Sequence, residues 1–385
     1  MRYEPFIEVN GDMVAYQRTA LVINMIRSGK TVDAPNYYPP LATILFLSAE
    51  NNLLSIPFHR ALLLLMIVAI ASTVAFISIW IDDETLRWLS IAVPGSIALL
   101  EPAVFFARFD LFPMLAILLA AVSFRKKLYG FVGAFLMLGC LLKLAPVFLI
   151  PILHITVPRG KRREFWCGMG LTALGVLCTS FIILGTGVTL ESMAAFFALR
   201  TAYPPYALST ASSVDLFIRM LLGGNGVIEW MAPDIGHFNT GLPVWLSPIL
   251  LLIAAAGAGW ITLLAARDPK REKNVVLYAS ATMMWLLVAT PLLTMHYYLW
   301  VLPLILFWFL EQVERAWKIT FWHGIAGLSA VTLALLGQWT YPTLYFDLVD
   351  HQTSLAVTVN FLRNAVALFL VVALLKSVKE MSKRR

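Results

Sequence analysis

The chain has 385 residues, of which 60% are hydrophobic and only 13% are charged. A soluble domain cannot bury that much apolar surface, because soluble proteins are closer to half apolar and a quarter charged. The net charge of +7 could indicate a nucleic-acid partner, but the basic residues lie in short segments between apolar runs, as in membrane proteins. Long apolar runs also exclude a transmembrane barrel, whose strands are short and alternating. We therefore predict an all-α, polytopic integral membrane protein.

The chain opens with a polar segment, residues 1–56, that precedes the first long apolar run. Apolar spacing predicts an amphipathic helix over 13–28, followed by a turn that includes Tyr38 and by a short apolar run at 41–49. That run is too short to cross a bilayer, so we expect a re-entrant or interfacial helix there. Asp12 is our candidate for a catalytic carboxylate at the membrane surface; its structural alternative is to cap the amphipathic helix.

Apolar runs of the length needed to cross the hydrocarbon core recur from there to the end of the chain. We predict one membrane-embedded domain over 1–385 with eleven transmembrane helices, several of them short and interrupted by proline. The predicted spans are 57–80, 87–101, 109–124, 128–142, 144–157, 165–187, 243–266, 274–293, 297–310, 320–338 and 355–376.

A long polar segment at 188–242 separates the spans of 57–187 from those of 243–376. We expect it to be an external loop. Within it, the sequence predicts short helices at 189–200 and 210–222, a Tyr-Pro-Pro-Tyr turn at 203–206 and a Gly-rich turn at 223–226.

Lysine and arginine are unevenly divided between the two predicted faces. Most of the 29 basic residues lie on one face, in clusters at 125–127, 159–163, 267–273, 315–318 and 376–385. Because cytoplasmic loops carry such an excess, this face is cytoplasmic and the tail 377–385 lies there. An odd number of spans then places residues 1–56 outside, and we expect a first transmembrane helix upstream of this sequence.

The predicted external face gathers ionisable and aromatic residues at the ends of several spans. An ionisable residue at membrane depth is costly, so each is by default a candidate for function. They are Asp12, Tyr37, Tyr38, Glu101, Arg108, Asp110, Lys143, Arg200, His296 and Tyr297.

Some of these residues also have ordinary structural interpretations. Arg108 and Asp110 could form an ion pair that caps the next helix. Lys143 could snorkel to the membrane interface. The tyrosines beside His296 could belong to an aromatic belt. Glu101, which precedes a proline, has no evident structural role.

The sequence does not favour a disulfide framework, a metal site or a nucleotide-binding site. The three cysteines, Cys140, Cys167 and Cys178, lie in apolar runs without paired spacing, so they indicate neither a disulfide framework nor a metal site. No metal-binding, P-loop or dinucleotide-binding motif occurs in a suitable context.

The order of these motifs resembles that of the GT-C superfamily of membrane glycosyltransferases, and within it glycosyltransferase family 87, whose members use polyprenol-phosphate mannose. The first pattern is an external acidic residue, a tyrosine, a glycine turn and a Tyr-Pro-Pro-Leu segment, here Asp12, Tyr16, Gly29 and Tyr38 to Leu41. The second is Arg108-Phe109-Asp110, basic residues 125–127, Gly130, Gly133, Lys143 and Pro146. The third is a late turn before a proline, with His296, Tyr297, Tyr298 and Pro303.

This resemblance implies a GT-C-like fold and an inverting transfer of a hexose, mannose by family. The donor would be a polyprenyl-phosphate sugar, and the acceptor a glycan or glycolipid at the external face. A lipid phosphate is already a good leaving group, so the reaction needs a base for the acceptor hydroxyl and cations for the phosphate, but no general acid. Divalent-metal dependence varies in the superfamily, which leaves room for Mg²⁺ or Mn²⁺, although no two-carboxylate site is evident.

The same resemblance implies roles for individual residues. Asp12 would be the general base. Arg108, Lys143 and Arg200 would bind the phosphate, and His296 would orient the donor or the acceptor. The remaining residues of the implied substrate site are Asp110, Tyr297, Tyr38 and Glu101.

The main alternative is a secondary transporter or a lipid flippase, because interrupted helices with intramembrane charges are also transporter features. The charges here gather at one face rather than at the midplane, and no pseudo-symmetric halves are visible. A purely structural membrane subunit would leave the convergent charges unexplained. The pattern therefore favours glycosyl transfer.

Overall fold

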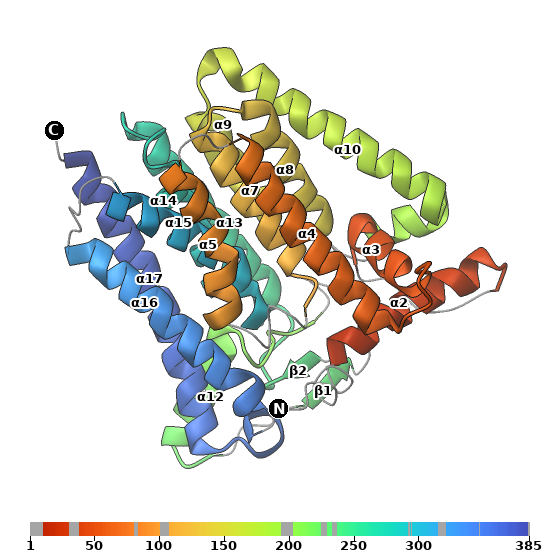
Figure 1. Cartoon of the computed structure of the whole chain (residues 1–385). Coiled ribbons are helices and arrows are strands. Elements are labelled where there is room, and N and C mark those ends of the chain that lie inside the picture. The colour runs from red at the N-terminus through yellow and green to blue at the C-terminus, as the bar shows by residue number, and fades with distance from the viewer. Residues whose placement is uncertain are drawn as a thin grey trace.

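The structure is a computed structural model that describes residues 11–30, 38–80, 84–100, 108–193, 203–224, 229–232, 237–291, 293, 295–314, 321–345 and 347–383. At some helical positions, Asp12 and His296 among them, it describes the backbone alone. Together these parts form a bundle of helices, with α2 (Gly11–Arg27) and α3 (Pro40–Glu50) beside one end of it (Figure 1).

The remaining elements follow in chain order. The first half of the bundle consists of α4 (Phe58–Trp80), α5 (Glu84–Leu100), α7 (Leu111–Arg125), α8 (Tyr129–Leu142), η1 (Ala145–Leu149), α9 (Ile150–Thr156), η2 (Arg159–Lys161) and α10 (Arg162–Leu184). Next come α12 (Thr210–Leu221) and the strands β1 (Glu229–Ala232) and β2 (His237–Asn239). The second half consists of α13 (Leu246–Arg267), α14 (Val275–Ala289), η4 (Met295–Trp300), α15 (Leu302–Glu314), α16 (Phe321–Gln338), η5 (Trp339–Thr343), η6 (Asp347–His351) and α17 (Ser354–Lys383).

Each predicted span overlaps helical segments of the structure, two of them in the case of 144–157 and of 297–310, and the two helices expected in the opening segment are α2 and α3. Five segments are long and apolar enough to cross a membrane alone: Phe58–Trp80, Arg159–Leu184, Leu246–Arg267, Phe321–Tyr341 and Ser354–Glu380. The other apolar helices are shorter because prolines and tight turns break them, as at 144–157, which is divided into η1 and α9. The total of eleven spans therefore stays a prediction.

The segment 188–242 agrees with the prediction only in part. The helix expected near 210–222 is α12, and Gly223 begins the expected turn with a φ of +74°. Most of the helix predicted at 189–200 lies outside the described residues. The antiparallel hairpin of β1 and β2 was not predicted, and it is the one departure from an all-helical fold in the described part of the chain.

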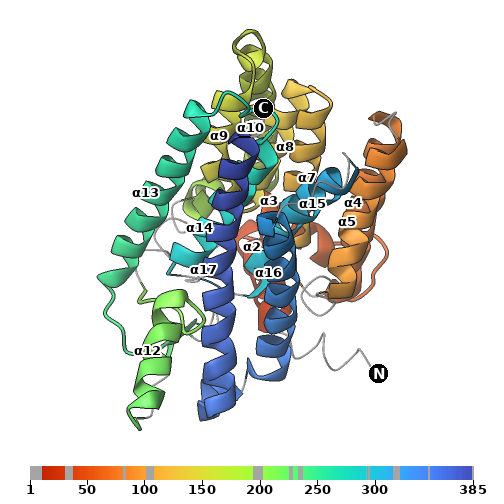
Figure 2. The ribbon, with the colours of Figure 1, turned by 90° about the vertical axis from the view of Figure 1, so that its left-hand side faces the viewer.

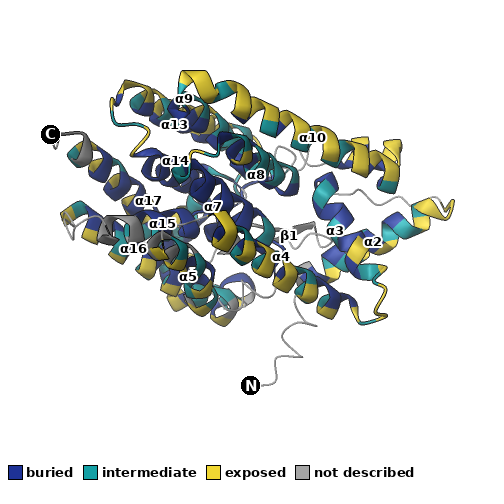
Figure 3. Ribbon diagram, turned by 45° about the horizontal axis from the view of Figure 1, so that its top comes forward, coloured by how far each residue is buried: buried dark blue, intermediate teal, exposed yellow. Residues whose placement is uncertain are grey.

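Two short helices, α7 and α14, form the centre of the bundle. All residues of α14 except Trp285 are buried, and α7 is buried along nearly its whole length. By contrast, most of α10 is exposed (Figure 3). Its exposed residues include Leu171, Leu174 and Ile182. An outer helix with exposed leucine and isoleucine is what hydrocarbon surroundings favour.

Glycines allow α8 and α10 to approach closely. A Cβ atom at Gly133 would collide with the Phe165 carbonyl, and one at Gly168 would collide with the Gly130 carbonyl. Small residues at such contacts let two helix backbones meet, which is a common device for helix packing in membranes. This contact fixes the position of α8 and of Lys143, the residue that follows it.

The basic loops around residues 125–127 and 267–273 meet at one end of the bundle. Arg125 donates a hydrogen bond to the Lys273 carbonyl at 3.1 Å, and the Tyr129 hydroxyl donates one to Glu272 at 3.2 Å. The C-terminus lies at this end, whereas α12 lies at the other (Figure 2). Because α7 runs from Leu111 to Arg125, its first turn is far from the basic loops.

Candidate functional site

Asp110 and Lys143 form a buried ion pair where α7 begins and α8 ends. The Lys143 Nζ lies 2.6 Å from the Asp110 Oδ1, and the two side chains are 9% and 0% exposed. Lys143 therefore does not snorkel to an interface. It is the residue that follows α8, and its extended backbone (φ −158°, ψ 131°) ends that helix. Burial of two charges is costly unless their geometry is good and further hydrogen bonds satisfy them.

Asp110 has a second hydrogen-bond donor. The Trp300 Nε1 donates to the same Oδ1 atom at 2.9 Å. Asp110 occupies the N-cap position of α7, but within the described part of the chain its side chain makes no capping hydrogen bond. The capping interpretation of Asp110 is therefore wrong, and Lys143 is the partner with which its carboxylate forms an ion pair.

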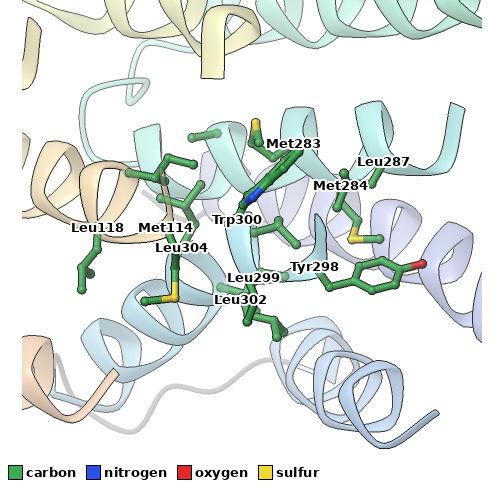
Figure 4. Packing of buried hydrophobic residues seen from close by; sticks show 14 of the residues in the cluster. Met114, Leu118, Met283, Met284, Leu287, Tyr298, Leu299, Trp300, Leu302 and Leu304 are labelled. Atoms are coloured by element: carbon green, nitrogen blue, oxygen red, sulfur yellow. The ribbon is translucent and has the colours of Figure 1, made fainter. Parts of the chain in front are cut away.

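Aromatic rings surround the ammonium group of Lys143. Its Nζ lies 4.8 Å from the ring centroid of Phe109, 4.5 Å from that of Tyr297 and 4.8 Å from that of Trp300. Tyr297 and Trp300 belong to η4 and stack on each other with centroids 4.3 Å apart. Figure 4 shows Trp300 and Leu299 of η4 within the buried core, near Met283 of α14. Cation–π contacts and the carboxylate together stabilise a lysine that has left water.

A second aromatic group joins the opening segment to this site. It is the Tyr16 cluster, which consists of Tyr16 from α2, Tyr38, Phe46 from α3 and Phe109. The Tyr16 ring stacks on Phe46 at 4.6 Å and meets Phe109 edge-on at 5.3 Å, and Tyr38 lies 5.9 Å from Phe109. Burial raises the pKa of Tyr16, as do Tyr38 and Asp110 nearby. The cluster therefore packs α2 and α3 against Phe109, the residue between Arg108 and Asp110.

Arg108 lies beside a third aromatic group, the Tyr206 cluster, which consists of Tyr206, Tyr341 and Tyr345. The Arg108 Cζ lies 5.3 Å from the centroid of Tyr341, whose ring meets that of Tyr345 edge-on at 5.4 Å. The hydroxyl oxygens of Tyr206 and Tyr345 are 2.9 Å apart. Arg108 and Tyr206 are buried, whereas Tyr341 and Tyr345 are half-buried.

Arg363, in the first half of α17, is a further buried cation near the site. It is 0% exposed, and its Nη2 donates to the Leu208 carbonyl at 2.6 Å and to Asn364 at 2.9 Å. Its Cζ lies 5.9 Å from the ring centroid of Tyr298, which follows Tyr297 in η4. Arg363 therefore links α17 to the residues just after Tyr206 and to η4.

The structure brings together five of the predicted site residues and leaves four undescribed. Tyr38, Arg108, Asp110, Lys143 and Tyr297 converge around the first turn of α7. Glu101 and Arg200, like Tyr37, lie outside the described residues. For Asp12 and His296 only the backbone is described: position 12 is one helical turn before Tyr16, and position 296 precedes Tyr297.

Sequence reasoning did not identify Trp300, Arg363 or the Tyr206 cluster. Arg363 had a signal, since it is a charge well inside the predicted apolar span 355–376. Trp300 had none, because tryptophan is common in membrane helices. Among the side chains that the structure describes, no group of three His, Cys, Asp or Glu residues could hold a metal ion.

A family model for glycosyltransferase family 87 matches residues 36–291, which is more than half of the chain. The matched region contains Arg108, Asp110 and Lys143, whereas Asp12 and Arg363 fall outside it. Comparisons with curated proteins and with solved structures gave no match. The match and the apolar helices identify a membrane glycosyltransferase rather than a transporter, and the chain belongs to glycosyltransferase family 87.

Proposed function

We propose that this glycosyltransferase moves a hexose, mannose by family resemblance, from a polyprenyl-phosphate donor to a glycan or glycolipid acceptor. The reacting groups would meet at the end of the bundle that carries α2, α3 and the start of α7. The observation that carries the proposal is the buried set of Arg108, Asp110 and Lys143. Fixed cations in apolar surroundings are what a departing lipid phosphate needs.

The three charges of this set have different roles. Asp110 neutralises Lys143, so the net positive charge of the three side chains is centred on Arg108. A guanidinium can also bind two phosphate oxygens at once, which an ammonium cannot. The positive end of the α7 dipole adds to the attraction. We therefore assign the phosphate to Arg108 first and treat Lys143 as a second cation that Asp110 and Trp300 hold in place.

Asp12 is the proposed base. Tyr16 anchors α2 against Phe109, which lies between Arg108 and Asp110 in the chain. Position 12 is one turn earlier on the same helix, or roughly 6 Å along its axis. The docking of α2 supports this role, because a base for the acceptor has to lie close to the phosphate site.

The reaction is then a single displacement. The acceptor hydroxyl loses its proton to Asp12 as its oxygen forms a bond to the anomeric carbon of the donor. The bond between that carbon and the phosphate oxygen breaks at the same time, and the configuration of the carbon is inverted. The electron pair leaves with the polyprenyl phosphate, whose charge Arg108 and Lys143 stabilise.

The site is proposed to face the non-cytoplasmic side of the membrane. The basic loops lie at the opposite end of the bundle, where Arg125 donates a hydrogen bond to the Lys273 carbonyl. Excess basic charge marks the cytoplasmic side. The donor lipid would then approach from the outer leaflet, next to α2 and α3.

The proposal is tested by transfer from radiolabelled polyprenyl-phosphate mannose to membrane glycolipids, with the purified full chain in vesicles. Asp12→Asn should abolish transfer and leave membrane insertion intact, because the amide cannot accept the proton. Glu191→Gln, at an exposed acid, is the matched control and should be fully active.

Arg108→Ala should weaken binding of the donor more than binding of the acceptor. Full transfer by Asp12→Asn would remove Asp12 as the base. Transfer from a nucleotide sugar, with none from any polyprenyl-phosphate sugar, would overturn the proposed donor class.

A further inference from the structure

We infer that the Tyr206 cluster recognises the hexose of the donor and so determines which sugar is transferred. This inference rests on the proposed function, because it takes Arg108 as the ligand of the donor phosphate. It assigns a role to Tyr206, Tyr341 and Tyr345, none of which the proposed reaction uses.

The position of the cluster relative to Arg108 carries the inference. The Tyr341 ring centroid lies 5.3 Å from the Arg108 Cζ, and Tyr345 and Tyr206 follow through the 5.4 Å ring contact and the 2.9 Å contact between hydroxyls. In a lipid-phosphate sugar, one oxygen atom joins the phosphorus to the anomeric carbon. A phosphate held by Arg108 therefore has its sugar ring within one ring's width of Arg108. The ring of Tyr341 lies at that distance, and Tyr345 and Tyr206 adjoin it in the cluster.

The chemistry of the cluster fits a sugar. A tyrosine hydroxyl both donates and accepts hydrogen bonds, as sugar hydroxyls do. The half-buried rings of Tyr341 and Tyr345 also offer apolar faces to the C–H groups of a hexose. By contrast, the Tyr16 cluster is formed by rings packed on one another, with Tyr16 and Phe46 fully buried. Its function is to dock α2.

Local structure holds the cluster in place. Tyr341 has an extended backbone (φ −137°, ψ 125°) inside a π-helical turn, and this kink separates it from α16. On the other side, the Tyr206 amide donates to the Pro291 carbonyl at 2.8 Å.

Three buried side chains of α17 hold the carbonyls that follow Tyr206. Asn360 donates to Ala207 at 3.4 Å, Arg363 to Leu208 at 2.6 Å, and Asn364 to Leu208 at 3.3 Å. A loop held by buried polar groups is pre-organised, which is what a site that distinguishes similar sugars requires.

The test measures binding of two ligands to the full chain in nanodiscs: polyprenyl-phosphate mannose and polyprenyl phosphate without a sugar. Tyr345→Phe and Tyr206→Phe should each weaken binding of the sugar-bearing lipid about two- to tenfold, because each removes one hydrogen-bonding hydroxyl. Both should bind the bare lipid as the native chain does. Tyr129→Phe, which removes a hydroxyl bonded to Glu272 at the basic end, is the matched control and should change neither affinity.

A competition between polyprenyl-phosphate mannose and polyprenyl-phosphate glucose completes the test. The preference of the native chain between these two epimers should fall in the two variants. Equal losses for the sugar-bearing and the bare lipid, or an unchanged preference, would overturn the inference. Arg108→Ala separates the two proposals: if it leaves binding of the bare lipid unchanged, the proposed phosphate site is wrong, whatever the tyrosine variants do.

Discussion

Lys143 and Asp110 are 33 residues apart in the chain, and their side chains meet at 2.6 Å with almost no exposure. We expect Lys143→Met to lower the free energy of unfolding by about 3–5 kcal/mol, because it leaves a buried carboxylate without its cation. The double variant Lys143→Met/Asp110→Leu should recover most of that loss, since an apolar pair needs no compensation. Thermal unfolding in detergent measures both effects.

Donor binding by the double variant shows whether Lys143 contacts the substrate or only stabilises the fold. If Lys143 also binds the phosphate, the double variant is stable but binds the donor more weakly than the native chain. Arg219→Ala, which breaks a partly exposed ion pair with Asp215 on α12, is the control and should change neither stability nor binding measurably. Native stability in Lys143→Met would contradict the account of the buried pair.

The partner of Asp110 illustrates what the sequence can and cannot predict. The sequence suggested Arg108 as the ion-pair partner of Asp110, because the two are only two residues apart. However, α7 and α8 are neighbours joined by a short turn at 126–128, so the residue before α7 lies beside the residue after α8. If α7 and α8 are taken as an antiparallel pair, their predicted ends already bring Asp110 close to Lys143. The sequence also predicted the long apolar helices α4, α10 and α13.

Other contacts carry no signal in the sequence. Arg363 binds the Leu208 carbonyl from 155 residues away, and a backbone carbonyl looks the same at every position. The strands β1 and β2 are four and three residues long, too short to show an alternating pattern. Trp300 reaches Asp110 across 190 residues, through a turn that resembled part of a membrane span.

The glycine contact between α8 and α10 predicts a sharp difference between two neighbouring positions. Gly168→Ala should lower the free energy of unfolding by about 1–3 kcal/mol, because the new Cβ would meet the Gly130 backbone, which cannot move aside easily. Gly170→Ala meets no atom within 4 Å and should leave stability unchanged or raise it slightly. Thermal unfolding of the two variants under one set of conditions is the measurement. Equal stability in both would mean that the helices are not in close contact at Gly168.

Docking of α2 should weaken at alkaline pH. Burial raises the pKa of Tyr16 well above its ordinary value of 10.0, so the folded state favours the neutral phenol. That stabilisation is complete below pH 10 and is lost as the pH rises through the folded-state pKa. Burial has the same effect on the pKa of Tyr38.

Tyrosinate absorbance and protection of α2 from proteolysis, followed together during an alkaline titration, measure this effect. The double variant Tyr16→Phe/Tyr38→Phe keeps the rings but cannot ionise there, so α2 should stay docked to higher pH. Release of α2 at the same pH in the native chain and in the double variant would show that these two hydroxyls are not responsible.

Arg363 should act as a positioning residue, because it touches the loop after Tyr206 and the ring of Tyr298. We expect Arg363→Met to raise the KM for the donor and lower kcat while leaving the KM for the acceptor unchanged, since the loop next to Arg108 would lose its strongest anchor. A hydrogen bond from a charged group contributes about 1.5–3 kcal/mol, so the change in kcat/KM should be about ten- to hundredfold.

Rescue separates positioning from general loss of structure. Arg363→Lys keeps the charge and one donor toward the Leu208 carbonyl, so it should recover part of the activity, although lysine cannot bind Leu208 and Asn364 with a planar fork. Ser377→Ala, on the same helix, removes a buried hydroxyl that donates to the Ala373 carbonyl within α17, and it should be fully active. If Arg363→Met and Arg363→Lys lose activity equally while both remain folded, the charge is not what orders the loop. If the KM values for donor and acceptor rise together, Arg363 supports the bundle as a whole rather than the donor side of the site.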